Sequence, residues 1–224
     1  MLITVARHLE PVPFAEGGDP LTDLDRPLSE EGRDGGKSLL ENVGEAAKEY
    51  RSSAWGGSYG AGYVSPYVRC RQTASLIAPA VSPEWRWYES PELRESAHAP
   101  QVSRLRGKLF AHEESAFELR DRVARFMALV HDATHPILVV THGDVVNAFR
   151  WVLEGLTLRE YLALYEDPDN FVPFGVAWSF NTDTRIAERR VLGDTTPDKA
   201  VEMKNRFAHG EDSYRLTLAE LGGE

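Results

Sequence analysis

Two histidines that lie far apart in the sequence occupy the same kind of position. Arg7 and His8 directly follow a short, mostly apolar run at residues 2–6. His142 directly follows a second apolar run at residues 136–141. Runs of this length that are rich in β-branched residues are typical of buried strands. Because ligands of an open α/β sheet bind outside the carboxyl ends of its strands, we expect these side chains to reach one ligand.

The residue types at such positions suit the transfer of a phosphoryl group. Arginine offers paired, planar donors to phosphate oxygens, and a neutral imidazole can act as a nucleophile near pH 7. Arg69 follows a strand that we expect at residues 61–65, and Glu95 follows another that we expect at residues 84–87. A carboxylic acid such as Glu95 can protonate a leaving oxygen.

The elements that would position these residues alternate between strands and helices. Ser29 is predicted to cap the first helix, because Glu30 and Glu31 favour the positive end of the helix dipole in its first turn. We expect helices at residues 29–50, 68–78, 115–132 and 144–153, another helix from Thr157, and late strands at residues 176–181 and 186–191. This alternation predicts a three-layer α/β/α fold, in which helices cover both faces of a mostly parallel central sheet.

Composition limits the partners and the compartment of the protein. The chain has 224 residues and a formal net charge of −10, which argues against nucleic acid or an anionic membrane as a partner. Cys70 is the single cysteine, and no signal peptide is evident, so we expect a cytoplasmic protein. The length predicts one domain over residues 1–224, with a substrate-covering excursion at residues 96–113 and a C-terminal extension at residues 194–224.

Five short motifs, in this order along the chain, resemble those of the histidine phosphatase superfamily, the phosphoglycerate-mutase-like proteins. They are Arg7-His8-Leu9-Glu10, Pro27-Leu28-Ser29-Glu30-Glu31-Gly32, Ser65 to Ala74 with Cys70 in the place of an alanine, Leu93-Arg94-Glu95, and His142-Gly143. The matches span residues 2–150. One such motif is a weak signal, whereas five in the expected order are specific.

The resemblance implies a role for each matched residue. His8 would attack phosphorus and become phosphohistidine, and Glu95 would act as the general acid and then as the base that activates water. The phosphoryl oxygens would be held by Arg7, Arg69, His142 and Gly143. No metal or other cofactor is implied, because the arginines and His142 supply the positive charge that Mg²⁺ supplies elsewhere. We therefore expect a metal-independent phosphatase that acts on a small phosphorylated monoester.

Two departures from the family pattern leave alternatives open. Leu9 stands in the place of a glycine that would allow close backbone approach to phosphate, which motivates a non-catalytic module that only binds a phosphorylated ligand. Residues 11–14 lack the Ser-x-Trp-Asn pattern of the mutase branch, so a phosphoglycerate-mutase-type phosphotransferase is disfavoured. A metal-dependent hydrolase is a further alternative, with His8, Glu10, Glu95 and His142 as ligands.

Overall fold

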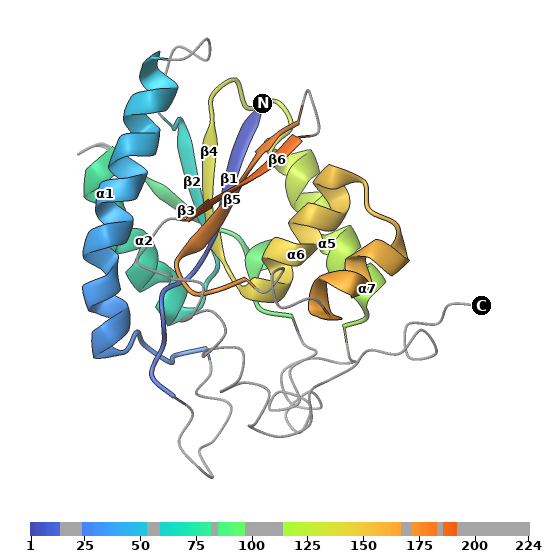
Figure 1. Cartoon of the computed structure of the whole chain (residues 1–224), viewed down its shortest axis with the longest axis horizontal. Helices are drawn as coiled ribbons and strands as arrows, with labels where there is room; N and C mark the ends of the chain where they lie inside the picture. Colours follow the sequence, from blue (N-terminus) through green and yellow to red (C-terminus); the bar gives the residue numbers. More distant parts are fainter. Residues whose placement is uncertain are drawn as a thin grey trace.

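A mixed sheet forms the centre of the protein in a computed structural model (Figure 1). The model describes residues 1–13, 24–52, 59–81, 85–96, 114–166, 172–182 and 186–191. Within these ranges the strands lie in the spatial order β3 (Trp87–Glu89), β2 (Ala61–Val64), β4 (Ile137–Thr141), β1 (Leu2–Arg7), β5 (Val176–Asn181) and β6 (Ile186–Val191). The first four of these strands are parallel to one another, β5 runs antiparallel to them, and β6, which pairs antiparallel with β5, runs in their direction again. The predicted α/β fold with a mostly parallel sheet is confirmed.

The register of the two central strands brings their carboxyl ends to one level. β1 pairs with β4 in parallel, and Arg7 lies opposite Thr141. The backbone N–H of His8 then donates to the carbonyl of Thr141 at 2.9 Å. The chain therefore leaves both strands at the same edge of the sheet, with His8 and His142 next to each other.

Helices cover both faces of the sheet, as Figure 1 shows. The first face carries α1 (Glu30–Ser52) and α2 (Val68–Val81), and the second carries α5 (Ala116–Val130) and α6 (Gly143–Glu154), with α7 (Leu158–Glu166) packed beyond α6. Because alternate strand residues point to opposite faces, β1 contributes Ala6 to the core under α1 and α2 and Val5 to the core under α5 and α6.

Local signals in the sequence explain most of the element boundaries. Ser29 caps α1 by accepting a hydrogen bond from the Gly32 N–H at 3.0 Å. Ser115 and Thr157 form capping boxes at the starts of α5 and α7, with Glu118 and Glu160 three residues later. The predicted helices and the two late strands are confirmed.

Two boundaries differ from the prediction. The third strand lies at Trp87–Glu89 rather than residues 84–87, because its pairing with β2 begins at Trp87, opposite Gly62. The second helix passes Pro79 and ends at Val81, whose buried side chain packs into the core. Residues 97–113 and 194–224, predicted as an excursion and an extension, lie outside the described ranges.

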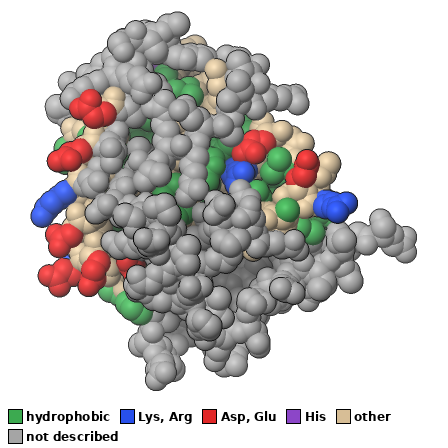
Figure 2. All heavy atoms as spheres, viewed as in Figure 1, with side chains coloured by type: hydrophobic (Ala, Val, Ile, Leu, Met, Phe, Trp, Pro, Cys, Tyr) green, Lys and Arg blue, Asp and Glu red, His purple; other side chains and the backbone are tan. Residues whose placement is uncertain are grey.

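The negative charge of the chain is visible on α1. Figure 2 shows acidic side chains gathered along the outer side of this helix. Its exposed acidic residues are Glu30, Glu31, Asp34, Glu41 and Glu45. None of the helices described is long and apolar enough to cross a membrane.

Candidate active site

His8 is fixed in one tautomer by its own loop. The Nδ1 atom lies 2.6 Å from the carbonyl oxygen of Leu9, which can only accept, so Nδ1 carries the proton. The lone pair of the ring is therefore on Nε2, where it accepts a hydrogen bond from Nε of Arg69 at 3.1 Å. His8 is buried, with 2 % exposed, and Nε2 is the ring nitrogen that keeps a lone pair.

Arg69 lies between the other polar groups at this edge. Its Nη2 atom is 3.3 Å from Nδ1 of His142 and 3.6 Å from Oε2 of Glu95. The guanidinium also lies over the ring of Tyr67, 4.6 Å from the ring centroid. Arg69 is the second residue of α2. It reaches these groups because the helix begins just after β2, next to the end of β4.

His142 caps the start of α6 and faces His8. The two rings are 5.2 Å apart in an edge-to-face arrangement. Nε2 of His142 lies 2.8 Å from the hydroxyl of Ser65, and Nδ1 lies 3.1 Å from Oε2 of Glu95. Nδ1 has two competing neighbours, the Glu95 carboxylate, which can only accept, and the Arg69 guanidinium, which can only donate. The shorter contact to Glu95 favours a proton on Nδ1, and Nε2 then accepts from Ser65.

Glu95 supplies the carboxylate of the group, and 20 % of its side chain is exposed. Its second oxygen, Oε1, accepts the backbone N–H of Ser96 at 3.1 Å. Oε2 is the atom that contacts Arg69 and His142. A carboxyl group in this position can exchange a proton with a ligand that binds next to His8 and displaces the Arg69 side chain from it.

Arg7 and Gly143 complete the set on the side of β5. The guanidinium of Arg7 donates to the carbonyl of Val172 and lies 4.0 Å from the ring centroid of Phe174. A Cβ atom on Gly143 would lie at an ordinary contact distance of 3.5 Å from Arg7, so the start of α6 lies directly beside the guanidinium. All six residues predicted for the site therefore lie at one edge of the sheet.

A family model for the histidine phosphatase superfamily (branch 1) matches residues 3–169. The chain belongs to this superfamily. The matched range includes all six residues described above. A comparison with curated proteins gave no match.

Solved structures of similar fold carry names from this superfamily. A mycobacterial glucosyl-3-phosphoglycerate phosphatase has a TM-score of 0.57 and 17% identity, with 87% of this chain and 99% of that chain covered. An alpha-ribazole phosphatase from Shigella flexneri has a TM-score of 0.57 and 18% identity, with 87% and 96% covered. At this identity the likeness establishes the fold of this superfamily member and not its substrate.

Burial and neighbouring arginines govern the charge of the site. Burial, and then the charge of Arg69, hold the pKa of both His8 and His142 well below 6.5, so both rings are neutral at pH 7. Burial also lowers the pKa of Arg7 to about 10, while Glu95 and Asp144 raise it, so Arg7 stays charged. Neutral imidazoles thus lie among charged guanidinium groups, an arrangement that favours an anion.

A metal ion fits the site of this superfamily member less well than an anion does. His8, Glu95 and His142 offer ligand atoms within 4.8 Å of one another, which is the chemistry of a transition-metal site. However, the guanidinium nitrogens of Arg69 contact all three groups and carry a positive charge in that space. Glu10, the fourth ligand of the metal hypothesis, is not part of this group.

Leu9 does not obstruct the site. Its side chain is buried in the core under α1 and α2, and its backbone N–H donates to Oγ1 of Thr73 at 3.1 Å. The substitution of the family glycine therefore adds core packing rather than bulk over His8. This removes the steric reason for a binding module without turnover.

Two groups in the site escaped the sequence analysis. The sequence predicts no role for Ser65, whose hydroxyl lies beside His142; its position directly after β2 is the signal that could have identified it. The segment that carries Val172 and Phe174 contributes a carbonyl and a ring to Arg7, and the N–H of Gly175 contacts the carbonyls of Arg7 and His8. Nothing in that segment's composition marks it as part of a polar site.

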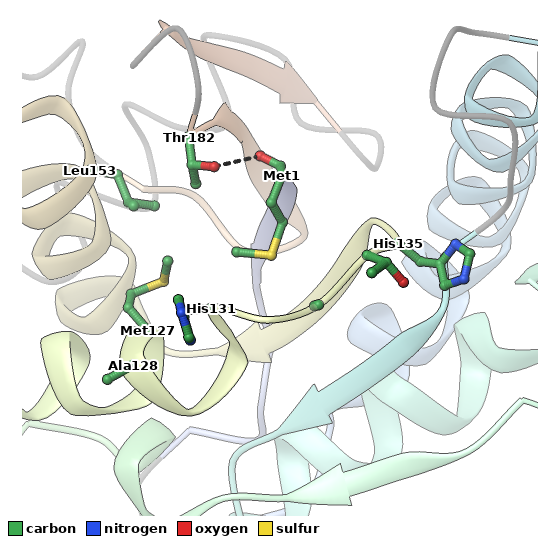
Figure 3. Close-up of a pocket in the computed structure, with 9 residues that line it drawn as sticks. Met1, Met127, Ala128, His131, His135, Leu153 and Thr182 are labelled. Carbon is green, nitrogen blue, oxygen red and sulfur yellow. Dashed lines mark hydrogen bonds between the residues drawn. The ribbon is translucent and has the colours of Figure 1, made fainter.

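A separate pocket of about 1030 Å³ lies at the opposite end of the sheet, where β1 and β4 begin. Met1, Met127 and Leu153 give it an apolar lining, and Figure 3 shows the hydroxyl of Thr182 bonded to the carbonyl of Met1 beside it. His131 and His135 also line it and are exposed. None of the six site residues contributes to this pocket.

Proposed function

We propose that this chain is a metal-independent phosphomonoester phosphatase that acts through a phosphohistidine at His8. The observation that carries the proposal is the geometry of His8: its Nδ1–H is bound to Leu9, so its Nε2 lone pair points to the guanidinium of Arg69. His142 and Glu95 lie within contact distance of the same guanidinium. The names of similar structures, which are phosphatases, support this function.

In the first step, the phosphoryl group of the substrate lies between the two histidines. Arg7, Arg69 and Nδ1–H of His142 donate to its oxygens, and the first N–H groups of α6, at Gly143, face it because they have no acceptor within the helix. Nε2 of His8 attacks phosphorus, and the bond from phosphorus to the leaving oxygen breaks. Glu95 in its protonated form gives its proton to that oxygen, which leaves as an alcohol.

In the second step, the ionised Glu95 takes a proton from water. The resulting hydroxide attacks phosphorus, and the bond from phosphorus to Nε2 breaks, which releases inorganic phosphate and restores His8. The hydrogen bond from Nδ1–H to Leu9 stabilises the ring while Nε2 carries the phosphoryl group. The arginines stabilise the negative charge on the phosphoryl oxygens in both steps, so positive charge is available without a metal ion.

We infer a small phosphorylated substrate from the same comparisons, because both similar phosphatases are named for small phosphorylated molecules. A screen of phosphomonoesters, including phosphoglycerates, sugar phosphates, nucleotides and an aryl phosphate, tests the proposal. We expect hydrolysis that survives EDTA and is lost in His8→Ala. Loss on chelation with rescue by added metal would favour the metal-dependent hydrolase, and transfer between phosphoglycerates without net release of phosphate would favour a mutase.

A further inference from the structure

A buried arginine that the proposed mechanism does not use lies behind Glu95. Arg122 is on α5 and is fully buried, on the same helix as the apolar core residues Leu119, Val123 and Phe126. A buried ion pair is weak support for stability, because desolvation of the charges offsets their attraction. The contacts of Arg122 therefore need a reason other than net stability.

The contacts of Arg122 reach two places, the carboxylate of Glu114 and the backbone just before Glu95. Nε and Nη2 of Arg122 donate to the two carboxylate oxygens of Glu114 at 2.6 and 2.7 Å. Nη1 donates to two backbone carbonyls, that of Glu92 at 2.6 Å and that of Arg94 at 2.9 Å. Arg94 also pairs with Glu114 at 3.3 Å.

The two carbonyls belong to the turn η2 (Pro91–Leu93) and the residue that follows it, directly before Glu95. The hydroxyl of Thr141 on β4 holds the intervening carbonyl, that of Leu93, at 2.7 Å. On the other side of Glu95, the hydroxyl of Ser96 donates to Asp144 of α6 at 2.7 Å. The backbone on both sides of Glu95 is therefore held by α5, β4 and α6.

We propose that Arg122, oriented by Glu114, is a positioning residue for Glu95 as the general acid. This inference rests on the proposed phosphatase function. The planar fork of an arginine fixes direction as well as distance, which lysine cannot do. A displacement of about 1 Å of a catalytic group can lower its rate about 10²-fold, so a loosened turn would impair proton transfer before it impaired folding.

The leaving group of the substrate distinguishes positioning from a structural role. An alkyl phosphate needs a proton on its leaving oxygen, whereas 4-nitrophenyl phosphate releases a stable phenolate without one. Values of kcat/KM report the steps up to formation of the phosphohistidine, which include this proton transfer. We expect Arg122→Lys to lower kcat/KM for the alkyl phosphate by about 10- to 100-fold and that for the aryl phosphate by less than about 3-fold.

Three further variants make the test specific. Glu114→Gln leaves the contacts of Arg122 with the two carbonyls but weakens its paired hydrogen bonds to residue 114. This variant should also lower kcat/KM for the alkyl phosphate more than for the aryl phosphate, by a smaller factor than Arg122→Lys. In a Glu95→Gln background, Arg122→Lys should have no further selective effect, because both changes act through one group. Arg125→Lys is the matched control on α5: its exposed side chain contacts the carboxylate of Glu92, and neither substrate should be affected.

An equal loss for both substrates, or a selective loss that persists in the Glu95→Gln background, would overturn the positioning role. If Arg122→Lys does not fold, Glu114→Gln and its double variant with Glu95→Gln decide the question by the same criteria. The phosphatase proposal itself, and this inference with it, would be overturned by either of two results. One is hydrolysis of neither ester by the wild type, and the other is hydrolysis by His8→Ala as fast as by the wild type.

Discussion

At the residue scale, the site depends on how Arg69 contacts three groups at once. The Nε–H of its guanidinium donates to the nucleophilic nitrogen of His8, and Nη2 lies beside His142 and Glu95. A phosphoryl group that enters the site replaces these contacts with stronger, charge-assisted hydrogen bonds to its own oxygens. The arginine therefore holds the histidines apart before binding and would bind the phosphoryl group afterwards.

We expect Arg69→Lys to lower kcat/KM by about 10²-fold or more, because an ammonium group cannot supply two parallel donors to developing negative charge. Steady-state kinetics with an aryl phosphate measures this. Arg71→Lys is the matched control, because Arg71 lies two residues later on α2, is exposed and pairs with Glu89. A loss of similar size in both variants would contradict the assignment of Arg69.

A second prediction at this scale concerns Leu9. Its side chain is 4 % exposed within the core under α1 and α2, so Leu9→Ala should lower the free energy of unfolding by about 2–5 kcal/mol. The folded variant should keep its kcat/KM, since the backbone N–H of Leu9 still reaches Thr73. Urea unfolding and kinetics on the same sample measure both quantities. An increase in activity without loss of stability would show that Leu9 obstructs the site.

At the scale of elements, the start of α1 supports the loop that carries His8. The carbonyl of Glu10 accepts hydrogen bonds from both the N–H and the hydroxyl of Ser29. Gly32 lies against this carbonyl so closely that an added Cβ would be 2.1 Å from the oxygen. The glycine in the Pro-Leu-Ser-x-x-Gly motif is thus explained by the close approach of helix and loop.

Gly32 and a second glycine of α1, Gly35, form a matched pair that tests the contact between α1 and the loop after His8. Gly32→Ala should lower the free energy of unfolding by about 1–3 kcal/mol through overpacking and should lower activity by moving the loop that follows His8. Gly35→Ala meets only Leu9, at an ordinary distance of 3.8 Å, and should raise stability by about 0.5–1 kcal/mol. Thermal unfolding with activity measurements tests both. Equal effects of the two substitutions would contradict the role of Gly32.

The parts of the structure that the sequence predicted are those with a local signal. Apolar runs followed by polar residues marked β1 and β4 correctly, and their parallel pairing brought His8 and His142 together. The third strand was misplaced because the alternation at residues 84–87 marks Trp85 and Trp87 alike, whereas the pairing with β2 begins at Trp87. Arg122 gave no signal, since an arginine within an amphipathic helix is usually solvated, and its buried partners come from other segments.

At the scale of the whole molecule, the buried histidines couple folding to pH. In the unfolded chain each takes up a proton below its ordinary pKa of about 6.5, whereas burial and Arg69 keep both neutral in the folded protein. Below about pH 6.5 the unfolded state therefore binds more protons than the folded state. The contribution of the two histidines to the free energy of unfolding is complete above this pH and is lost as the pH falls below it.

Between pH 7.5 and 5.5 we expect His8 and His142 to lower the free energy of unfolding by up to about 2–3 kcal/mol together. Urea unfolding at the two pH values, compared between the wild type and the double variant His8→Gln/His142→Gln, isolates this contribution. His131→Gln/His135→Gln is the control, because both of these side chains are exposed. A wild-type pH dependence that matches the His8→Gln/His142→Gln variant would contradict the burial of neutral rings.

The most direct measurement is the trapping of the phosphorylated chain. Rapid quenching during turnover of an aryl phosphate, followed by peptide mass spectrometry at alkaline pH, locates the transferred group. The geometry of His8 predicts one acid-labile phosphoryl group on Nε2 of His8, absent in His8→Gln and still formed, more slowly, in His142→Gln. Turnover with no phosphorylated intermediate, or a phosphoryl group on any other residue, would contradict the proposed mechanism.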